Sequence, residues 1–505
     1  MITTGSTFGK QYTDTADVVV VGSGAGGAPV AYQLASAGLK VILLEAGEAV
    51  QTEDLNKDVW RSTEKLWLDK AASFTVGTPP IVLPLGRNLG GTTTINSGTC
   101  FHLPEKTFSN WKRSAGLTGF EYADLVPYFN LLDHYLNVTE VPYELMGANN
   151  QLFAEGATKL GLSPKPLRRN QRNCQGSGIC AFGCPRGAKQ SMDKSFLPDA
   201  SKAGAQIITG ATVSHISTEN GKATGVSGFF GKNKDNSTGT FAIKAAKVVI
   251  SCGAIYTPYL LLKNKIANSS GLVGKNLRIH PVSKVLAFFD KPIYAWRGVP
   301  QALYVDDYAH EGIMFEGFFL PPAFLSVAIP ATGLKLKEYM AKYNQMAGFG
   351  IMVSDSSHGR VRLGWGGGTP LMTYNLNTED TQKFIKGIEI AAKVYLAAGA
   401  NQVLLPIHGI PPIIQEQDLA ILKTARISAA DLEISAFHPL GTCQLGDNPR
   451  KSVVNNLLQT HDIQNLYIVD ASVFPTGLGV NPQITIMAFS LRTADHIVST
   501  FSKNL

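Results

Sequence analysis

The sequence contains a glycine-rich segment whose spacing suits the binding of a nucleotide pyrophosphate. Gly22, Gly24 and Gly27 form a GxGxxG pattern directly after the apolar run 17–21. Gly22 allows a tight turn, Gly24 lets a pyrophosphate approach the backbone, and Gly27 lets a helix pack closely on the preceding strand. Glu45 follows the next apolar run, where a carboxylate can bind ribose hydroxyls. The pattern predicts a dinucleotide-binding unit.

A second group with chemical potential is a cluster of three cysteines, Cys174, Cys180 and Cys184, followed by Pro185. Thiolates this close in sequence can bind an iron–sulfur cluster, and a proline after the last ligand is frequent in such runs. Structural thiols and one disulfide are alternatives. A zinc site lacks an obvious fourth ligand unless His215 supplies it. The spacing alone leaves these interpretations open.

The elements that would position these groups begin with a β-α-β unit. Residues 17–21 and 40–44 have the apolar character of buried parallel strands, and a helical stretch between them ends near Gly38. Residues 245–251 and 466–470 predict further strands, each followed by a helix. We therefore predict an α/β fold with a Rossmann-like domain assembled from residues 15–105, 190–285 and 435–505.

The rest of the chain, residues 106–189 and 286–434, is predicted to form a smaller α+β substrate-binding domain with a connecting lid, built on an antiparallel sheet. Within it, residues 315–329 hold four phenylalanines and little polarity. That stretch fits an apolar substrate channel, a surface in contact with lipid, or domain core. Its prolines argue against a membrane helix.

Composition narrows the class of protein. The chain has 505 residues, 44% of them hydrophobic and 16% charged, with a net charge of +7. These values indicate a compact globular protein, and the basic excess is too diffuse to predict nucleic-acid binding. No apolar run is long enough for a transmembrane helix. Residues 1–14 lack the pattern of a secretory signal, so the cytoplasm is the expected location.

Four ordered segments beyond the glycine pattern resemble the glucose-methanol-choline (GMC) oxidoreductases, a family of FAD-dependent enzymes. They comprise residues 86–96, 253–262, 435–443 and 470–485. Residues 189–191, 274–281 and 472–476 are most similar to the long-chain alcohol oxidase branch. The resemblance implies FAD as cofactor. No histidine lies in the loop 90–96, so we expect the FAD to be bound non-covalently.

The resemblance also implies two catalytic residues, His438 and Asn481. Histidine suits removal of the hydroxyl proton because its unperturbed pKa is about 6.5. The Asn481 amide would hold the substrate oxygen, at a position where many family members have a second histidine. Asn481 and Pro482 also form a good helix start, and the positive end of that helix would face the flavin.

Further residues are implied to contact the cofactor. Gly91, Asn96 and Ser97 would line the flavin, Asp470 and Ala471 the ribityl or phosphate region, and the Val213 backbone the adenine. The predicted cofactor-binding residues are thus Gly22, Gly24, Gly27, Glu45, Gly91, Asn96, Ser97, Val213, Asp470, Ala471 and Pro482. Structural roles are expected for His102 and His280.

The expected activity is FAD-dependent oxidation of a lipophilic primary alcohol to the aldehyde, with oxygen or an electron carrier as acceptor. One alternative is a sugar or polyol dehydrogenase that passes electrons through a [3Fe-4S] cluster on Cys174, Cys180 and Cys184, by resemblance to certain bacterial GMC dehydrogenases. Another is a lyase or a photodecarboxylase of the same family. The sequence names neither the substrate, the electron acceptor nor the oligomeric state.

Overall fold

The computed structural model describes residues 1–55, 58–231 and 236–502. Its larger sheet is built around consecutive valines, and Val18, Val19 and Val20 are fully buried. Such a run without polar alternation suits a parallel strand that is covered on both faces. The parallel strands, in spatial order, are β1 (Ile2–Thr4), β7 (Gln206–Thr209), β3 (Val41–Leu44), β2 (Gln11–Val21) and β10 (Gly239–Ile250).

On the edge that does not pair with β2, strand β10 has two different neighbours. Its first half pairs antiparallel with β9 (Lys222–Phe230), which in turn pairs with β8 (Ala211–Glu219). Its second half pairs in parallel with β20 (Leu466–Ile468). The last strand of the chain is thereby joined to the centre of this sheet.

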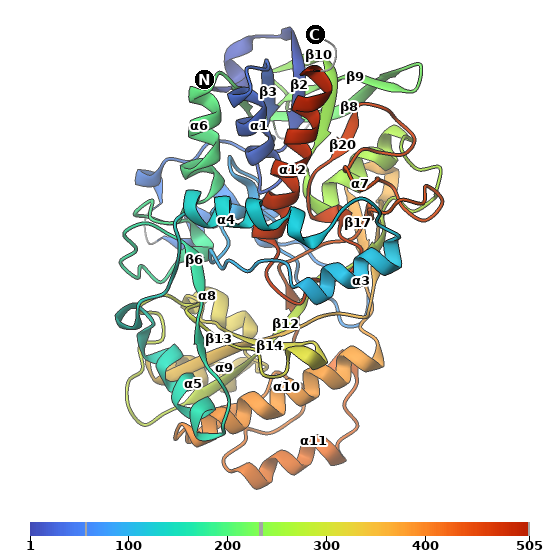
Figure 1. The fold of residues 1–505 in the computed structure, drawn as a ribbon. Coiled ribbons are helices and arrows are strands. Elements are labelled where there is room, and N and C mark those ends of the chain that lie inside the picture. Colours follow the sequence, from blue (N-terminus) through green and yellow to red (C-terminus); the bar gives the residue numbers. More distant parts are fainter. Residues whose placement is uncertain (56–57, 232–235, 503–505) are drawn as a thin grey trace.

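Helices α1 (Gly27–Ser36), α6 (Phe196–Lys202) and α12 (Gln483–Ser502) pack together in the upper part of the molecule (Figure 1). Helix α1 begins at Gly27, the last glycine of the GxGxxG pattern, which we call the glycine fingerprint (Gly22, Gly24 and Gly27). It ends where the Gly38 N–H donates to the Ala35 carbonyl at 2.9 Å, in the left-handed conformation that glycine adopts without strain.

The second sheet lies in the lower part of Figure 1, and its strand pairs are antiparallel. Helices α5 (Gly147–Lys159) and α10 (Thr378–Ala397) pack against it. Its strands, in spatial order, are β18 (Gln402–Leu404), β12 (Pro281–Phe288), β15 (Met346–Val353), β14 (Ile313–Gly317), β13 (Leu303–Val305) and β5 (Lys165–Pro166), with β19 (Ser435–Ala436) beside β12. The predicted fold class is confirmed.

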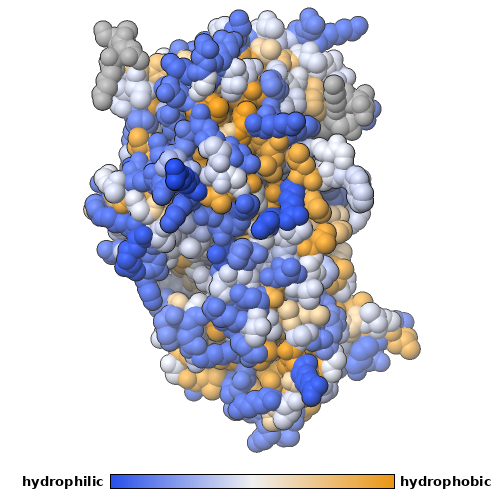
Figure 2. Space-filling model, turned by 90° about the vertical axis from the view of Figure 1, so that its right-hand side faces the viewer, coloured by the Kyte–Doolittle hydropathy of each residue, from blue (hydrophilic) through white to orange (hydrophobic). Residues whose placement is uncertain are grey.

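The apolar stretch 315–329 divides between core and surface. Phe315 lies in β14 and is fully buried, whereas Val327 is largely exposed. No helix in the described parts of the chain is long and apolar enough to span a bilayer. Hydrophilic residues are spread over the face in Figure 2, with hydrophobic residues between them.

Shorter elements connect the two sheets and cover their edges. In Figure 1, α3 and α4 cross the middle of the molecule between its upper and lower parts. These elements are α2 (Val59–Leu66), α3 (Glu105–Ala115), α4 (Val126–Tyr135), β4 (Val138–Glu140), β6 (Arg168–Asn170), α7 (Gly253–Asn264), β11 (Lys275–Leu277), α8 (Pro322–Leu325), α9 (Gly333–Ala341), β16 (Gly359–Leu363), β17 (Pro370–Thr373) and α11 (Ile421–Thr424).

Candidate active site

His438 and Asn481 lie side by side, although 43 positions separate them in sequence. His438 follows β19, and Asn481 precedes α12. The Asn481 Nδ2 and His438 Nε2 atoms are 3.4 Å apart. Because an amide nitrogen can only donate, this contact makes Nε2 the acceptor and puts the ring proton on Nδ1. Burial lowers the pKa of the His438 imidazole to about 4, which favours the neutral ring at neutral pH.

A carboxylate completes this group, and the sequence analysis missed it. Asn481 Nδ2 also lies 3.4 Å from Oε2 of Glu316, to which Gln301 Nε2 donates at 2.5 Å. Glu316 comes from β14 and is 6% exposed. Burial raises the pKa of its carboxyl to about 7, partly offset by the hydrogen bonds from Asn481 and Gln301. A single acidic residue inside an apolar strand is the pattern that could have identified it.

Several polar atoms of this group have no hydrogen-bond partner among the described residues. They are Nδ1 of His438, Oδ1 of Asn481 and Oε1 of Glu316, and all three are enclosed. Buried polar atoms in folded proteins are nearly always paired, so unpaired atoms concentrated at one place indicate a binding site. The group therefore offers both donors and acceptors to a small polar ligand.

His280, directly before β12, is a neighbour of His438. Its ring is perpendicular to that of His438, with 5.8 Å between the centroids, and it is fully buried. Its Nε2 accepts a hydrogen bond from the Gly479 N–H at 3.0 Å, two residues before Asn481. Burial, together with the nearby His438, lowers the pKa of the His280 imidazole to about 3. A neutral His280 thus supports the loop that carries Asn481.

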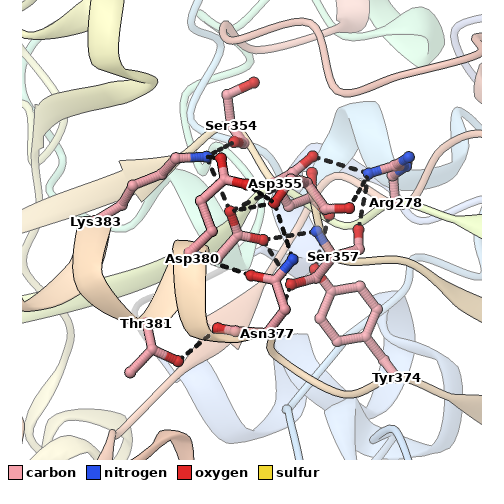
Figure 3. Close-up of polar contacts among 11 residues, drawn as sticks. Arg278, Ser354, Asp355, Ser357, Tyr374, Asn377, Asp380, Thr381 and Lys383 are labelled. Atoms are coloured by element: carbon pink, nitrogen blue, oxygen red, sulfur yellow. Dashed lines mark hydrogen bonds and ion pairs between the residues drawn. The ribbon is translucent and has the colours of Figure 1, made fainter.

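A polar cluster fixes the segment that leads to His280 (Figure 3). Arg278 Nη1 donates to the carbonyls of Asp355, Ser356 and Ser357 at 2.7 to 3.0 Å. The same loop is held from the other side by Asp380, in the first turn of α10, which accepts from the Ser357 N–H and hydroxyl at 2.7 and 2.6 Å. The start of α10 and the histidine segment are thereby joined through one short loop.

The glycine fingerprint leaves room for a ligand on one side only. A Cβ atom on Gly27 would lie 1.9 Å from the Gly22 carbonyl oxygen, so close packing of α1 on β2 requires glycine there. A Cβ on Gly24 would meet no atom within 4 Å. Gly24 lies three residues before the start of α1, and the N–H groups at a helix N-terminus suit a phosphate. These features fit the pyrophosphate of a dinucleotide such as FAD.

Glu45 stands at the end of β3, as the sequence analysis predicted. Its carboxylate accepts hydrogen bonds from the Ser23 N–H and hydroxyl at 3.0 and 2.6 Å and from the Gly47 N–H at 2.7 Å. Burial raises the pKa of the Glu45 carboxyl, against the effect of these hydrogen bonds. Glu45 thus lies beside the fingerprint loop, with both oxygens engaged.

The loop that holds the predicted flavin contacts meets the fingerprint loop. A Cβ on Gly91 would lie 3.1 Å from Cα of Gly24, so the two loops approach closely. Asn96 Nδ2 donates to Oε1 of Gln483, the first residue of α12, at 2.8 Å. This bond joins the loop to the helix that begins after Pro482. The carbonyl of Ser97 accepts from Arg169 Nε at 2.7 Å.

The remaining predicted contacts lie on neighbouring elements. Asp470, directly after β20 and Val469, accepts from the Gly253 N–H at 3.0 Å and from the Thr257 hydroxyl at 2.5 Å, which joins it to α7. The Ala471 carbonyl accepts from the Gly441 N–H at 3.1 Å. Val213 lies half-buried in β8.

The three clustered cysteines are free thiols that line one small cavity together with Arg169 and Lys189. In the described parts of the chain, no three metal-ligating side chains come close enough to share an ion. The [3Fe-4S] cluster, one of the alternatives that the spacing left open, is therefore not supported, and the structure agrees with the alternative of free thiols. His215, the suggested fourth zinc ligand, is exposed on β8.

Comparison with known proteins identifies relatives over the whole chain. Two models described as GMC oxidoreductase match residues 10–282 and 355–490. An uncharacterized GMC-type oxidoreductase of Mycobacterium tuberculosis is 36% identical, over 96% of this chain and 76% of the relative. A long-chain-alcohol oxidase of Arabidopsis thaliana is 28% identical, over 96% and 69%. A 2-methyl-1,2-propanediol dehydrogenase of Mycolicibacterium austroafricanum is 28% identical, over 97% and 96%.

Solved structures of the same fold include pyridoxine 4-oxidase from Mesorbium loti, with a TM-score of 0.71 and 19% identity over 95% of this chain and 98% of that chain. An Aspergillus oryzae formate oxidase variant has a TM-score of 0.74 and 16% identity, over 98% and 99%. The sequence matches, the glycine fingerprint beside its open space and the His438–Asn481 pair agree with one another. The chain belongs to the GMC oxidoreductase family.

Proposed function

We propose that this protein oxidises a primary alcohol to the aldehyde, with FAD held non-covalently between the fingerprint, the loop 90–97 and the start of α12. The observation that carries the proposal is the 3.4 Å contact between His438 and Asn481, whose remaining polar atoms are unpaired among the described residues. When bound, FAD supplies the acceptor for the hydride from the alcohol carbon. The cofactor contacts and domain bounds given above are part of this proposal.

The two side chains have complementary roles toward the alcohol oxygen. When the alcohol binds, Asn481 Nδ2 donates a hydrogen bond to that oxygen in place of its 3.4 Å contact with His438 Nε2, and so fixes the position of the oxygen. His438 Nε2, which is neutral and unprotonated, accepts the hydroxyl proton. The resulting imidazolium lies near Glu316, and an ionised Glu316 carboxylate would offset its charge. His438 and Asn481 are thus the proposed catalytic residues.

A lipophilic alcohol is the substrate class that we favour. The long-chain-alcohol oxidases of Arabidopsis thaliana are relatives along nearly the whole chain. Exposed apolar side chains also lie in the segments around His438. Phe437 precedes it directly, and Val82, which is bridged to Ser435, is bridged in turn to Phe74. This apolar surface suits the approach of an alkyl chain, and oxygen is the acceptor that we propose.

The test is an anaerobic titration of the purified holoenzyme with a medium-chain primary alcohol and, separately, with 2-methyl-1,2-propanediol. Loss of the flavin absorption bands with the first alcohol is expected. His438→Ala should slow this bleaching by about 10²- to 10⁴-fold and leave FAD bound. His310→Ala, which changes an exposed histidine between β13 and β14, is the matched control and should bleach at the parent rate.

Two outcomes would contradict the proposal. Fast bleaching in His438→Ala would remove His438 from proton transfer. Unchanged flavin bands with every alcohol would remove alcohol oxidation itself. Turnover in the dark without bleaching would then indicate a lyase, and product formation only under blue light would indicate a photodecarboxylase.

A further inference from the structure

The cysteine cavity contains two buried cations whose charges the proposed alcohol oxidation does not use. Arg169 is 2% exposed and Lys189 is 3% exposed. Both line the cavity with Cys174, Cys180 and Cys184. Burial lowers the pKa of the Lys189 ammonium to about 8.

Neither cation forms an ion pair with a carboxylate in the part of the chain that the structure describes. Arg169 donates to the Ser97 carbonyl, to Gln171 Oε1 and, from Nη2 at 3.2 Å, to Sγ of Cys180. Lys189 donates to three carbonyls, those of Thr94, Asn96 and Cys180, at 2.7, 2.6 and 3.1 Å. Among these acceptors, the Cys180 sulfur is the one that can ionise.

Buried charges are costly unless a counter-charge neutralises them. A cation that donates a hydrogen bond to sulfur favours the thiolate, which is the nucleophilic form of cysteine. Cys180 is also only half-buried and borders a cavity, so a small reagent can reach it. The Cys180 sulfur is therefore hydrogen-bonded to a buried cation and accessible from the cavity.

We propose that Cys180 is a reactive thiolate, the counter-ion of Arg169 and Lys189, and a site of oxidation by hydroperoxides. The thiolate sulfur attacks hydrogen peroxide, a sulfur–oxygen bond forms and the oxygen–oxygen bond breaks. Sulfur loses two electrons to the peroxide, and the second oxygen leaves as hydroxide. The product is the neutral sulfenic acid. The oxidation of Cys180 stands apart from the proposed function, on which the internal source of peroxide and the effect on FAD binding both rest.

The oxidation has a consequence for the loop proposed to contact FAD. Arg169 and Lys189 hold the carbonyls of Thr94, Asn96 and Ser97, which span the predicted flavin contacts. When the thiolate becomes a neutral sulfenic acid, both cations lose their counter-charge at this position. Their contacts with loop 94–97 then change, and the affinity for FAD falls.

The first test treats the holoenzyme with added hydrogen peroxide and dimedone near neutral pH and maps the products by peptide mass spectrometry. We expect at least ten times more modification of Cys180 than of Cys174, which lines the same cavity without a hydrogen bond to either cation. A disulfide that includes Cys180 counts as the same oxidation, because the sulfenic acid precedes it. Cys100 and Cys443 serve as internal controls, since burial raises the pKa of both thiols.

Equal modification of Cys174 and Cys180, or none at Cys180, would overturn the proposal. Because peroxide is added, this result does not depend on whether the protein oxidises alcohols.

The second test measures the dissociation constant of FAD before and after peroxide treatment. We expect this dissociation constant to increase at least fivefold in the parent protein and in Cys174→Ser. It should not change in Cys180→Ser, because the serine hydroxyl can accept the hydrogen bond from Arg169 but cannot be oxidised in this way. An increase of the same size in Cys180→Ser would overturn the link between Cys180 and the FAD loop.

Discussion

Replacing Glu316 by glutamine tests whether a neutral carboxyl is built into the site. Burial lifts the pKa of this group from an ordinary 4.5 to about 7. The folded protein therefore binds the proton more tightly than the unfolded chain, and stability falls as pH rises between these values. The full cost of ionising the buried group is about 3.4 kcal/mol, because each pKa unit corresponds to about 1.4 kcal/mol.

Part of this cost is already present at pH 5, so the loss between pH 5 and pH 8 is about 2.5 kcal/mol. Glutamine cannot ionise, so the free energy of unfolding of Glu316→Gln should fall by about 2.5 kcal/mol less than that of the parent over this range. The assay is urea unfolding at both pH values with saturating FAD, followed by tryptophan fluorescence and checked for reversibility. Glu219→Gln, at the exposed end of β8, is the control and should follow the parent. Parallel pH dependence in parent and Glu316→Gln would refute the reasoning.

Two further substitutions test the cofactor cradle and the polar cluster. Gly24→Ala should reduce FAD affinity about tenfold or more, measured by fluorescence titration, at unchanged apoprotein stability, because its Cβ meets only the open space. Gly26→Ala, whose Cβ would lie 1.8 Å from the Val469 carbonyl oxygen, should instead prevent folding. Equal effects of the two substitutions on FAD affinity and on stability would refute the proposed FAD site at Gly24. Asp380→Asn should cost about 3 kcal/mol in urea unfolding, because it leaves Lys383 and the loop 355–357 without their buried partner. Glu379→Gln, which breaks an exposed pair with the same lysine, should cost at most about 1 kcal/mol.

Local sequence patterns were sufficient to predict the nucleotide side of the fold. The valine run of β2, the glycines and the second strand β3 are contiguous, so their period and spacing specify one β-α-β unit. The segments with β10 and β20 were also identified from short apolar runs. Their pairing with each other depends on contacts between residues more than 200 positions apart, and no local pattern in the sequence predicts it.

The site was predicted less completely, for a physical reason. His438 and Asn481 stand in recognisable motifs, whereas the only signal for Glu316 in the sequence is a single acidic residue in an apolar strand. Its contact with Asn481 and its raised pKa depend on burial, which is a property of the whole tertiary structure. The cysteines show a second limit of sequence patterns. Their spacing allowed a metal site, a disulfide or structural thiols, and the tertiary structure places them as free thiols around a cavity shared with Arg169 and Lys189.

The two neighbours of strand β10 determine when this protein can fold during synthesis. Residues 248–250 need residues 466–468 as their partner, so this edge of the main sheet stays open until residues 466–468 have left the ribosome. Contacts between such distant segments form slowly, and an open strand edge invites pairing with other chains. Nascent chains should therefore depend on chaperones until α12 has been made. A truncation before β20 should yield an aggregation-prone product rather than a smaller enzyme.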